Sequence, residues 1–462
     1  MKQNQGNKQK NIQSKPLRKI MVMIIAMAIV FTDCQKNTKE FLLLQLIYIS
    51  SVATTDSGSG GPTFTPAIDV LDTSFNSPNG FIIQTVGSVS DYGYSLVIQP
   101  DGKILLGGHC DSGSGWDFCI ARFNSNGTLD TTFGTGGKLI QDIGTALDFG
   151  HSLVIQPDGK ILLGGYCQIS YSRFCIARFN SEGTIDTTFG SSGKVIQNIG
   201  SFYGDLGYSL AIQPDGKILL GGSCDNGSNF DFCIARFNSD GTLDTTFGSI
   251  GEAIQPIGSA GDHGYSLAIQ TDGKILLGGS CGSGLNLDFC IARFNSNGTL
   301  DTSFGSSGKV IQPLGSSYNI GKSLAIQPDG KILLGGSCNY KFCIARFNSN
   351  GTLDTTFGSS GKVIQPIGSD SDWGSSLTIQ PDGKILLGGY CYNGSYYDFC
   401  IARFNSNGTL DTSFGTSGKV IQPIGSSDDI GRSLAIQPDG KILLGGSCFD
   451  GIYNGFCIAR FK

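Results

Sequence analysis

Short apolar runs separated by glycine-rich turns recur along most of the chain. In one copy these runs cover residues 208–213, 217–224, 232–238 and 252–258. Runs of about five to eight residues bounded by Gly, Pro, Asn and Asp are typical of β-strands. The second and third runs are apolar at consecutive positions, which predicts strands that are covered on both faces. A "PDG" turn joins the first two runs, and its glycine supplies the positive φ of a hairpin.

The same four-strand unit is repeated along the chain. "DGK" occurs seven times, and the spacing is 57 residues in every interval except the fifth, where it is 53. Small antiparallel sheets buried on both faces favour a β-propeller, and a linear β-solenoid is the alternative. The last copy ends at Lys462 before a fourth strand, whereas residues 71–87 begin the chain's repeats with the missing piece. We therefore predict an all-β, seven-bladed propeller of four-stranded antiparallel blades over residues 68–462, its ring closed by residues 81–86 completing the last blade.

The repeated motif also resembles a known family. "SLAIQPDGKILLGG" followed by "IARFNSNGTLDTTFG" resembles the delta-60 repeat of bacterial secreted and surface proteins, which is related in layout to NHL-type blades. The resemblance extends over residues 68–462. It implies a propeller, but it implies neither a defined activity nor a set of catalytic residues.

Residues 1–33 have the pattern of a signal peptide. A basic stretch precedes a 12-residue apolar run at 20–31, which is too short to span a bilayer. "FTDC" at 31–34 resembles the lipobox of bacterial lipoproteins, and this resemblance implies lipidation of Cys34, although Asp33 stands where the family has a small residue. Residues 34–67 then form a tether and a Ser/Thr/Gly-rich linker. We expect an exported protein held at the bacterial outer membrane or cell surface, with periplasmic or secreted location and an uncleaved anchor as alternatives.

Composition narrows the class of partner. Of 462 residues, 39% are hydrophobic and 15% are charged, which is typical of a folded chain and not of a disordered one. The net charge is −5, and no run of Lys and Arg follows the signal peptide. A nucleic-acid partner requires a basic footprint, so the sequence argues against nucleic acid.

Two cysteines flank a variable insert in every copy. The pairs stand at the end of the second strand and the start of the third, where a hairpin brings Cα atoms within disulfide reach. We expect a disulfide within each copy, in keeping with an oxidising compartment; reduced core cysteines and a metal site are the alternatives. The expected pairs are Cys110 with Cys119, Cys167 with Cys175, Cys224 with Cys233, Cys281 with Cys290, Cys338 with Cys343, Cys391 with Cys400 and Cys448 with Cys457.

The variable segments are expected on a single face. A meander places the inserts between the cysteines, and the segments before "SLAIQ", at the same end of each blade. If "SLAIQ" is innermost, a variable position in the second set surrounds the channel mouth. The candidate binding residues there are Tyr94, His151, Tyr208, Tyr265, Lys322 and Arg432; those on the inserts are Trp116, Tyr171, Phe230, Tyr340, Tyr396 and Tyr453. The alternative is that these aromatics pack between blades and that the neighbouring Asp residues build turns.

Motifs for catalysis, cofactors and metals are lacking. The three histidines, His109, His151 and His263, occupy non-equivalent positions, and residues 238–244 resemble a calcium loop only weakly. We expect no cofactor and no metal. The leading hypothesis is a monomeric, lipid-anchored binding or scaffold protein that presents variable loops to a protein or glycan. A propeller hydrolase or lactonase acting at the channel mouth, and an inert structural surface protein, are the alternatives.

Overall fold

The computed structural model describes residues 70–462, apart from 145–146, 201–203, 284–285 and 316–317. The segments predicted to form a signal peptide, a tether with Cys34 and a linker lie outside the described residues. Within the part of the chain that the structure describes, no helix has the length and apolar character that crossing a membrane requires. The described fold is all-β and is built from repeated four-stranded antiparallel sheets.

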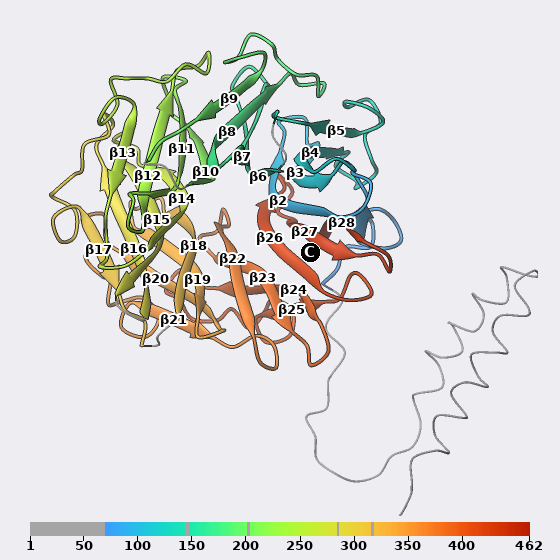
Figure 1. Cartoon of the computed structure of the whole chain (residues 1–462). Helices are drawn as coiled ribbons and strands as arrows, with labels where there is room; N and C mark the ends of the chain where they lie inside the picture. Colours follow the sequence, from blue (N-terminus) through green and yellow to red (C-terminus); the bar gives the residue numbers. More distant parts are fainter. Residues whose placement is uncertain (1–69, 145–146, 201–203, 284–285, 316–317) are drawn as a thin grey trace, which may run out of the picture. The chain divides into compact units, whose positions relative to one another are not determined.

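Each repeat supplies strands of four kinds, which follow one another from the centre outward (Figure 1). The innermost strands are β2 (Asp91–Ile98), β6 (Leu147–Ile155), β10 (Asp205–Ile212), β14 (Asp262–Ile269), β18 (Asn319–Ile326), β22 (Asp372–Ile379) and β26 (Asp429–Ile436). The second strands are β3 (Ile104–Asp111), β7 (Ile161–Gln168), β11 (Ile218–Asp225), β15 (Ile275–Ser283), β19 (Ile332–Cys338), β23 (Ile385–Tyr392) and β27 (Ile442–Phe449).

The third and outer strands complete the sheets. The third strands are β4 (Trp116–Phe123), β8 (Ser172–Phe179), β12 (Phe230–Phe237), β16 (Asn286–Phe294), β20 (Phe342–Phe347), β24 (Tyr397–Phe404) and β28 (Asn454–Phe461). The short outer strands are β5 (Lys138–Gln141), β9 (Lys194–Gln197), β13 (Glu252–Gln255), β17 (Lys309–Gln312), β21 (Lys362–Gln365), β25 (Lys419–Gln422) and β1 (Phe81–Gln84). Five sheets have four strands. In the sixth, a single parallel bridge between Trp116 and Leu147 joins β2–β5 to β6–β9.

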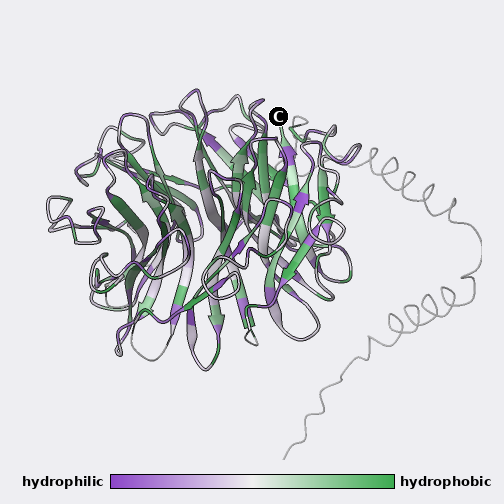
Figure 2. Cartoon of the chain, turned by 90° about the horizontal axis from the view of Figure 1, so that it is seen from above, coloured by the Kyte–Doolittle hydropathy of each residue, from purple (hydrophilic) through white to green (hydrophobic). Residues whose placement is uncertain are grey.

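The apolar core lies between neighbouring sheets. Ile218, Leu219 and Leu220 of β11 are all fully buried, although they follow one another in a strand and so point to opposite faces. One cluster joins Phe232 and Phe247 of one repeat to Leu277 of the next. Figure 2 shows the corresponding apolar bands along the strands and the polar connections at both ends. Consecutive apolar positions are therefore required, because each middle strand is covered by a sheet on either side.

Hydrogen bonds connect each innermost strand to the next. The hydroxyl of a Ser accepts a bond from the backbone N–H of a Leu in the following repeat, and the distance is 3.0 Å in every case. The Ser and Leu pairs are Ser95 with Leu153, Ser152 with Leu210, Ser209 with Leu267, Ser266 with Leu324, Ser323 with Leu377, Ser376 with Leu434 and Ser433 with Leu96. The last pair joins the final repeat to the first.

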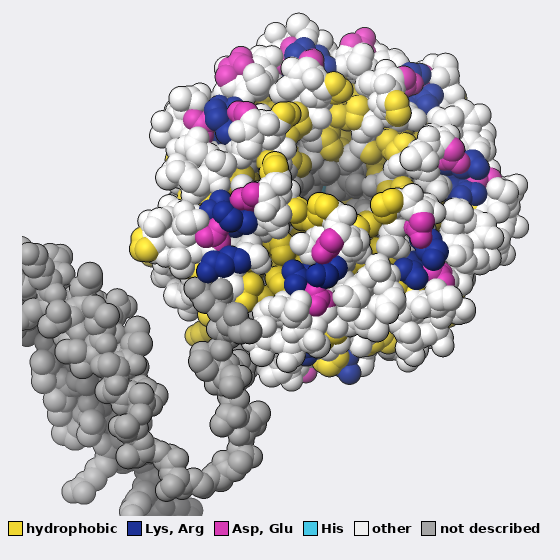
Figure 3. Space-filling view, turned by 180° about the vertical axis from the view of Figure 1, so that it is seen from behind, with side chains coloured by type: hydrophobic (Ala, Val, Ile, Leu, Met, Phe, Trp, Pro, Cys, Tyr) yellow, Lys and Arg dark blue, Asp and Glu magenta, His cyan; other side chains and the backbone are white. Residues whose placement is uncertain are grey.

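A buried arginine provides a second connection between repeats. Arg236 Nε donates to Asp244 at 2.7 Å, and its Nη1 donates to the carbonyl oxygen of Ser296 in the next repeat at 2.6 Å. Its guanidinium carbon lies 4.6 Å from the ring centroid of Phe247. Lys217 bonds the same Asp244 carboxylate at 2.6 Å. Similar Lys–Asp and Arg–Asp pairs recur in the other repeats, and basic and acidic side chains lie side by side around the face in Figure 3.

The two ends of the repeat region meet in one sheet. β1 pairs antiparallel with β28, with Ile82 opposite Ile458, and the strand order is β1-β28-β27-β26. Asp72 forms ion pairs with Arg460, whose Nε lies 2.9 Å from its carboxylate, and with Lys441, whose Nζ lies 3.2 Å away. Asp72 and Arg460 thus repeat, between distant parts of the sequence, the contact that Asp244 and Arg236 make within one repeat.

The innermost strands begin earlier than the sequence predicts. The apolar pattern places the start of one such strand at Tyr208, whereas β10 begins at Asp205. Its first residues, Asp205 to Gly207, still pair with β11, although Gly207 and the polar Asp interrupt the apolar pattern. The variable positions expected on preceding loops therefore belong to the strands themselves.

A glycine pair in the second strand permits the close approach of the innermost strand. A Cβ at Gly279 would overlap the carbonyl oxygen of His263 in β14, and the same holds at the equivalent glycine of each repeat. We expect Gly279→Ala to destabilise the protein by about 3 kcal/mol, because backbone rather than a side chain must move. Gly261→Ala, in the same repeat and near only the tip of His263 at 3.9 Å, is the control. The midpoints of urea unfolding measure both, and equal midpoints would contradict the argument.

Candidate functional site

A β-bulge in each innermost strand aims one variable side chain at the centre. In β10, Gly207 pairs with Gly222 and Ser209 with Gly221, so that Tyr208 is the extra residue. A bulge turns the side chain of its extra residue away from the regular alternation. The same register shift occurs in all seven innermost strands. The extra residues, here called the bulge ring, are Tyr94, His151, Tyr208, Tyr265, Lys322, Ser375 and Arg432.

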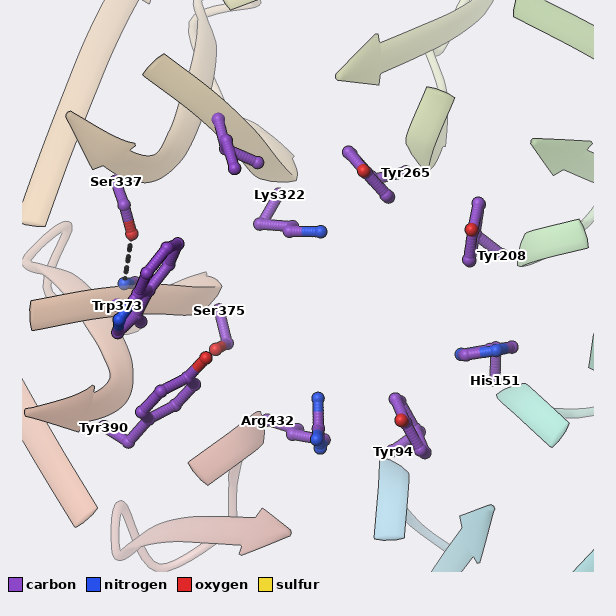
Figure 4. Close-up of a pocket in the computed structure, with 12 residues that line it drawn as sticks. Tyr94, His151, Tyr208, Tyr265, Lys322, Ser337, Trp373, Ser375, Tyr390 and Arg432 are labelled. Carbon is purple, nitrogen blue, oxygen red and sulfur yellow. Dashed lines mark hydrogen bonds between the residues drawn. The ribbon is translucent and has the colours of Figure 1, made fainter. Parts of the chain in front are cut away.

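Neighbouring members of the bulge ring contact one another around most of the circle. The ring centroids of Tyr94 and His151 lie 4.5 Å apart, those of His151 and Tyr208 5.1 Å, and those of Tyr208 and Tyr265 5.1 Å. Lys322 Nζ lies 3.3 Å from the ring centroid of Tyr265, and Arg432 Cζ lies 4.2 Å from that of Tyr94. Six predicted site residues are thus brought together, and they point into a shared space in Figure 4.

The ring is interrupted at its smallest member. Ser375 stands between Lys322 and Arg432, and a cavity of about 410 Å³, which all members of the bulge ring line, extends past it to Trp373 and Tyr390. Trp373 and Tyr390 form its wall beside Ser375 (Figure 4). A volume of this size accommodates a small organic molecule. The cavity therefore has two cationic side chains on either side of a hydroxyl, with aromatic walls.

Burial changes the protonation of Lys322 and His151, which face this space. Burial, followed by repulsion from Arg432, lowers the pKa of Lys322 from 10.5 to about 7. Burial, followed by repulsion from His109, lowers the pKa of His151 well below its usual value. Among the described residues, neither Lys322 nor Arg432 forms an ion pair, and no carboxylate lines the cavity. His151 is consequently neutral at pH 7, and the positive charge near the cavity has no compensating anion.

Half-buried tyrosines surround the same space. Burial raises the pKa of Tyr265 to about 12 and raises the pKa values of Tyr208, Tyr166 and Tyr390 above their usual range. Their hydroxyls stay protonated at neutral pH and offer hydrogen-bond donors as well as acceptors. The cavity combines aromatic surface with neutral polar groups.

Sequence reasoning missed a second layer of side chains. His109 is 5% exposed, stacks with Tyr94 at 5.1 Å and lies against Trp116, and burial together with Arg432 lowers its pKa to about 3. Tyr166 stacks with His151 at 5.3 Å, and Trp373 with Tyr390 at 6.2 Å. A signal was present, because the residue before the first cysteine of a pair is Ser in four repeats and His or Tyr in three.

The insert aromatics divide into two groups. Trp116 packs against Tyr92 at 5.4 Å and Phe230 against His263 at 5.5 Å, so both are partly buried, as the packing alternative requires. The other four are exposed: Tyr171 by 45%, Tyr340 by 43%, Tyr396 by 47% and Tyr453 by 42%. Tyr340 also contacts Trp373 of the cavity wall at 5.4 Å. We call Tyr171, Tyr340, Tyr396 and Tyr453 the exposed tyrosines.

The inserts lie beside the segments that precede the innermost strands. Asp372 N donates to the carbonyl oxygen of Tyr340 at 2.9 Å, and Tyr397 N donates to Asp428 at 3.0 Å. Each bond joins the insert of one repeat to the start of the next. The two variable sets therefore share one end of the sheets, as the meander predicts.

The recurring aspartates before the bulges hold turns. Asp91 accepts from the backbone N–H groups of Val86 and Gly87 at 2.6 and 2.8 Å, and Asp372 does so from Ile367 and Gly368. These bonds support the turn-building interpretation. Three carboxylates, Asp117, Asp142 and Asp148, have oxygens within 4.8 Å of one another. Asp148 already accepts from Ile143 N, and among the residues that the structure describes no further metal-ligating side chain joins the group.

All seven cysteine pairs form disulfides. Their Cα atoms lie 5.6–5.9 Å apart, and every cysteine is at most 1% exposed. The bonded cysteines do not stand directly opposite each other, because Cys224 pairs in register with Asp231, and Cys233 with Gly222. The bridges cross the ladder diagonally. Multiple disulfides indicate an exported or extracellular protein.

Comparison with known families identifies the repeats. A model described as "Domain of unknown function (DUF5122) beta-propeller" matches residues 99–133, 156–189, 213–247, 270–304, 327–357 and 380–414. The matched segments fall in successive repeats, and the chain is a β-propeller repeat protein. No curated protein sequence matches this chain.

Solved structures share the fold at low sequence identity. A streptogramin B lyase has a TM-score of 0.51 and 13% identity, with 83% of this chain and 98% of that chain covered. The catalytically inactive virginiamycin B lyase from Staphylococcus aureus with quinupristin has a TM-score of 0.52 and 14% identity, with the same coverage. The aldose sugar dehydrogenase of Streptomyces coelicolor is less similar, with a TM-score of 0.41, 14% identity, and 70% and 96% coverage. At these identities the first two describe the fold alone.

Proposed function

We propose that this β-propeller repeat protein is an exported binding protein with a closed ring of seven blades. The circular series of Ser–Leu hydrogen bonds supports closure, since Ser433 bonds Leu96 as each other Ser bonds its successor. The pairing of β1 with β28 and the bonds of Asp72 to Arg460 support it as well. The repeats resemble the delta-60 repeat, and in this proposal a lipid on Cys34 holds the propeller at the cell surface.

The exposed tyrosines are the observation that carries the binding proposal. Each lies on an insert whose base is clamped by a disulfide, so the loop can vary without disturbing the sheet. Large aromatic side chains exposed beside polar groups are typical of recognition surfaces. The inserts and the bulge ring occupy the same end of the sheets, which places variable chemistry around the cavity. A protein or glycan partner fits this face.

Replacement of the exposed tyrosines should weaken binding without unfolding the protein. We expect a variant with Tyr171→Ser, Tyr396→Ser and Tyr453→Ser to lose at least tenfold in affinity for a partner found on a glycan and matrix-protein array. Surface substitutions of this kind change stability little. A variant with Ile140→Ser, Ile254→Ser and Ile364→Ser, at exposed positions of the outer strands, is the control. Unchanged binding by the tyrosine variant at an unchanged unfolding temperature would reject the proposal.

An enzyme acting at the channel mouth is the second candidate. One observation favours it: burial and Arg432 lower the pKa of Lys322 to about 7, so that part of the population has a free amine at neutral pH. A free amine can accept a proton or attack a carbonyl carbon. A screen of ester, lactone and glycoside substrates with the wild type and with Lys322→Met tests this. Turnover that Lys322→Met abolishes would establish it, and no turnover by the wild type would exclude it for those substrates.

A further inference from the structure

The three repeats that contain Lys322, Ser375 and Arg432 break the aromatic character of the bulge ring. The four other repeats place Tyr or His at this position, and each ring contacts the next. Ser375 has no aromatic ring with which to contact its neighbours, and the cavity that the whole bulge ring lines extends past it to Trp373 and Tyr390. The gap is therefore flanked by the two cationic members of the bulge ring.

The charges at this gap are not balanced within the protein. Lys322 and Arg432 each lie over a tyrosine ring, and the residues that line the cavity include no carboxylate. Arg432 Nε is also buried without a hydrogen-bond partner. A cation held away from water without an anion is costly. The whole chain is acidic, with a net charge of −5, so this pair is a local exception rather than part of a basic surface.

The walls of the cavity indicate the kind of molecule that carries the compensating charge. Trp373 and Tyr390 present aromatic surface, while Ser375 and the protonated tyrosines present hydroxyls. An inorganic oxyanion would pair with the cations but would make no packing contact with the aromatic walls. A sugar ring has an apolar face for stacking and hydroxyls for hydrogen bonds, and about 410 Å³ accommodates one or two such rings.

We propose that the cavity over Ser375 binds a carboxylate-bearing sugar, with its carboxylate between Lys322 and Arg432 and its ring against Trp373 and Tyr390. This inference rests on the proposed binding function and names the ligand class of its central cavity. Arginine and lysine donate charge-assisted hydrogen bonds to a carboxylate. The bound carboxylate would also relieve the repulsion between the two cations.

Titration with D-glucuronate tests the proposal, with D-glucose and inorganic phosphate as comparison ligands. Trp373 lies in the cavity wall and its fluorescence reports binding; Trp116 is the second tryptophan of the chain. We expect D-glucuronate, or its oligomers, to bind at least tenfold more tightly than D-glucose and than phosphate. If D-glucose bound as tightly as D-glucuronate, the proposed role of the cations would be wrong. If phosphate bound as tightly as D-glucuronate, the proposed recognition of a sugar ring would be wrong. No binding of glucuronate or its oligomers would overturn the whole proposal.

Substitutions in the cavity can distinguish loss of ligand binding from loss of the fold. Ser375→Tyr introduces the side chain that Tyr94, Tyr208 and Tyr265 have at the equivalent position, so it should fold while filling the gap. We expect it, and Arg432→Gln, to lose at least tenfold in affinity for glucuronate. Lys362→Gln changes the net charge equally but lies on an outer strand, where its Nζ donates to the carbonyl oxygen of Pro313; it should bind like the wild type. Unchanged affinity in Ser375→Tyr at an unchanged unfolding temperature would contradict the location.

The affinity should depend on pH through Lys322. Its pKa of about 7 in the free protein means that above pH 7 the carboxylate must bind with uptake of a proton, so affinity should fall up to tenfold per pH unit. Among the groups that face Lys322, burial raises the pKa values of Tyr265, Tyr208 and Tyr390 above 10 and lowers those of His151 and His263 below 6.5. None of these shifts accounts for a fall in affinity just above pH 7. A pH-independent affinity would overturn the role of Lys322.

One measurement requires no ligand. Lys322→Met removes a partly buried cation that has no carboxylate partner, so we expect its unfolding temperature at pH 6 to rise by a few degrees. Because the lysine pKa is about 7 in the fold and near 10.5 when unfolded, the wild type gains stability between pH 7 and 10 and the advantage of Lys322→Met shrinks. A lower unfolding temperature at pH 6 would contradict the unpaired cation. The two proposals can fail separately. If the cavity variants lose glucuronate but still bind the array partner, the proposed function of the exposed tyrosines is unaffected. If the wild type binds glucuronate but replacement of the exposed tyrosines leaves binding of the array partner unchanged, only the function of the exposed tyrosines is rejected.

Discussion

Asp72→Ala should lower the free energy of unfolding by about 4 kcal/mol, since it leaves Arg460 buried without its carboxylate. Arg460 is 5% exposed, and Asp72 is its partner at 2.9 Å, while Lys441 and Ser74 bond the same carboxylate at 3.2 and 2.7 Å. The loss should exceed that of an ordinary ion pair, because Asp72 also holds the segment that leads to β1. Urea unfolding measures the stability, and hydrogen exchange at Phe81–Gln84 measures release of β1.

Asp244→Ala is the matched control for ring closure. It removes the same contacts, to Arg236 and Lys217, but within one repeat of a continuous chain. We expect Asp244→Ala to cost a similar local free energy while β1 stays protected from exchange. Asp439→Ala removes an ion pair with Lys441 in which the Asp439 side chain is 53% exposed. It should lower the free energy of unfolding by less than about 1 kcal/mol. If β1 exchanges equally slowly in Asp72→Ala and Asp244→Ala, Asp72 does not hold the two ends together.

The Asp72 contribution should also depend on pH. Burial raises the pKa of this carboxyl, but hydrogen bonds from Ser74 and Lys441 and the charge of Arg460 outweigh burial and lower it from 3.8 to about 2. A depressed carboxyl pKa stabilises the fold above about pH 4, and this stability is lost as the pH falls toward 2. The difference between the wild type and Asp72→Ala should shrink over that range.

Removal of one disulfide should cost about 2.5 kcal/mol, as expected for a loop of roughly ten residues. The double variant Cys224→Ala/Cys233→Ala opens a single bridge whose Cα atoms lie 5.8 Å apart. The bridge holds the base of a variable insert, so its loss lets the unfolded chain explore more conformations and frees the end of the hairpin. Unfolding in urea under oxidising conditions measures the difference in stability.

The reducing condition is the control for packing. In dithiothreitol the unfolded wild type loses its bridges, so the wild type should fall in stability by far more than one bridge is worth. The remaining gap between the two proteins should then reflect only Cys-to-Ala packing. All seven bridges are buried, so folded wild type without urea should keep them. Identical stabilities of the two proteins under oxidising conditions would show that this bridge contributes nothing.

The repeated strands and the disulfide pairs could be read from the sequence because both depend on local pattern. Apolar runs such as Ile218 to Leu220 require a sheet on each side, and Cys224 and Cys233 flank a hairpin insert. The position of the bulge ring could also be read, since Tyr208 and its equivalents vary among near-identical copies. The bulge itself could not, because Gly207 and Asp205 resemble a turn until the pairing with β11 is seen.

What the sequence by itself determined is the repeated blade, with its strands, turns and bridges, since each depends on residues within one copy. Only the tertiary structure decided which bulge residues touch. All seven members of the bulge ring line the cavity, and Ser375 meets there Lys322 and Arg432, which stand about 55 positions away along the chain on either side. The contacts that His109, Trp373 and Tyr390 make with the bulge ring also became visible only in the tertiary structure. How strongly the charges of Lys322 and Arg432 act on each other in the cavity depends on the distances between repeats, and the packing of the sheets sets those distances.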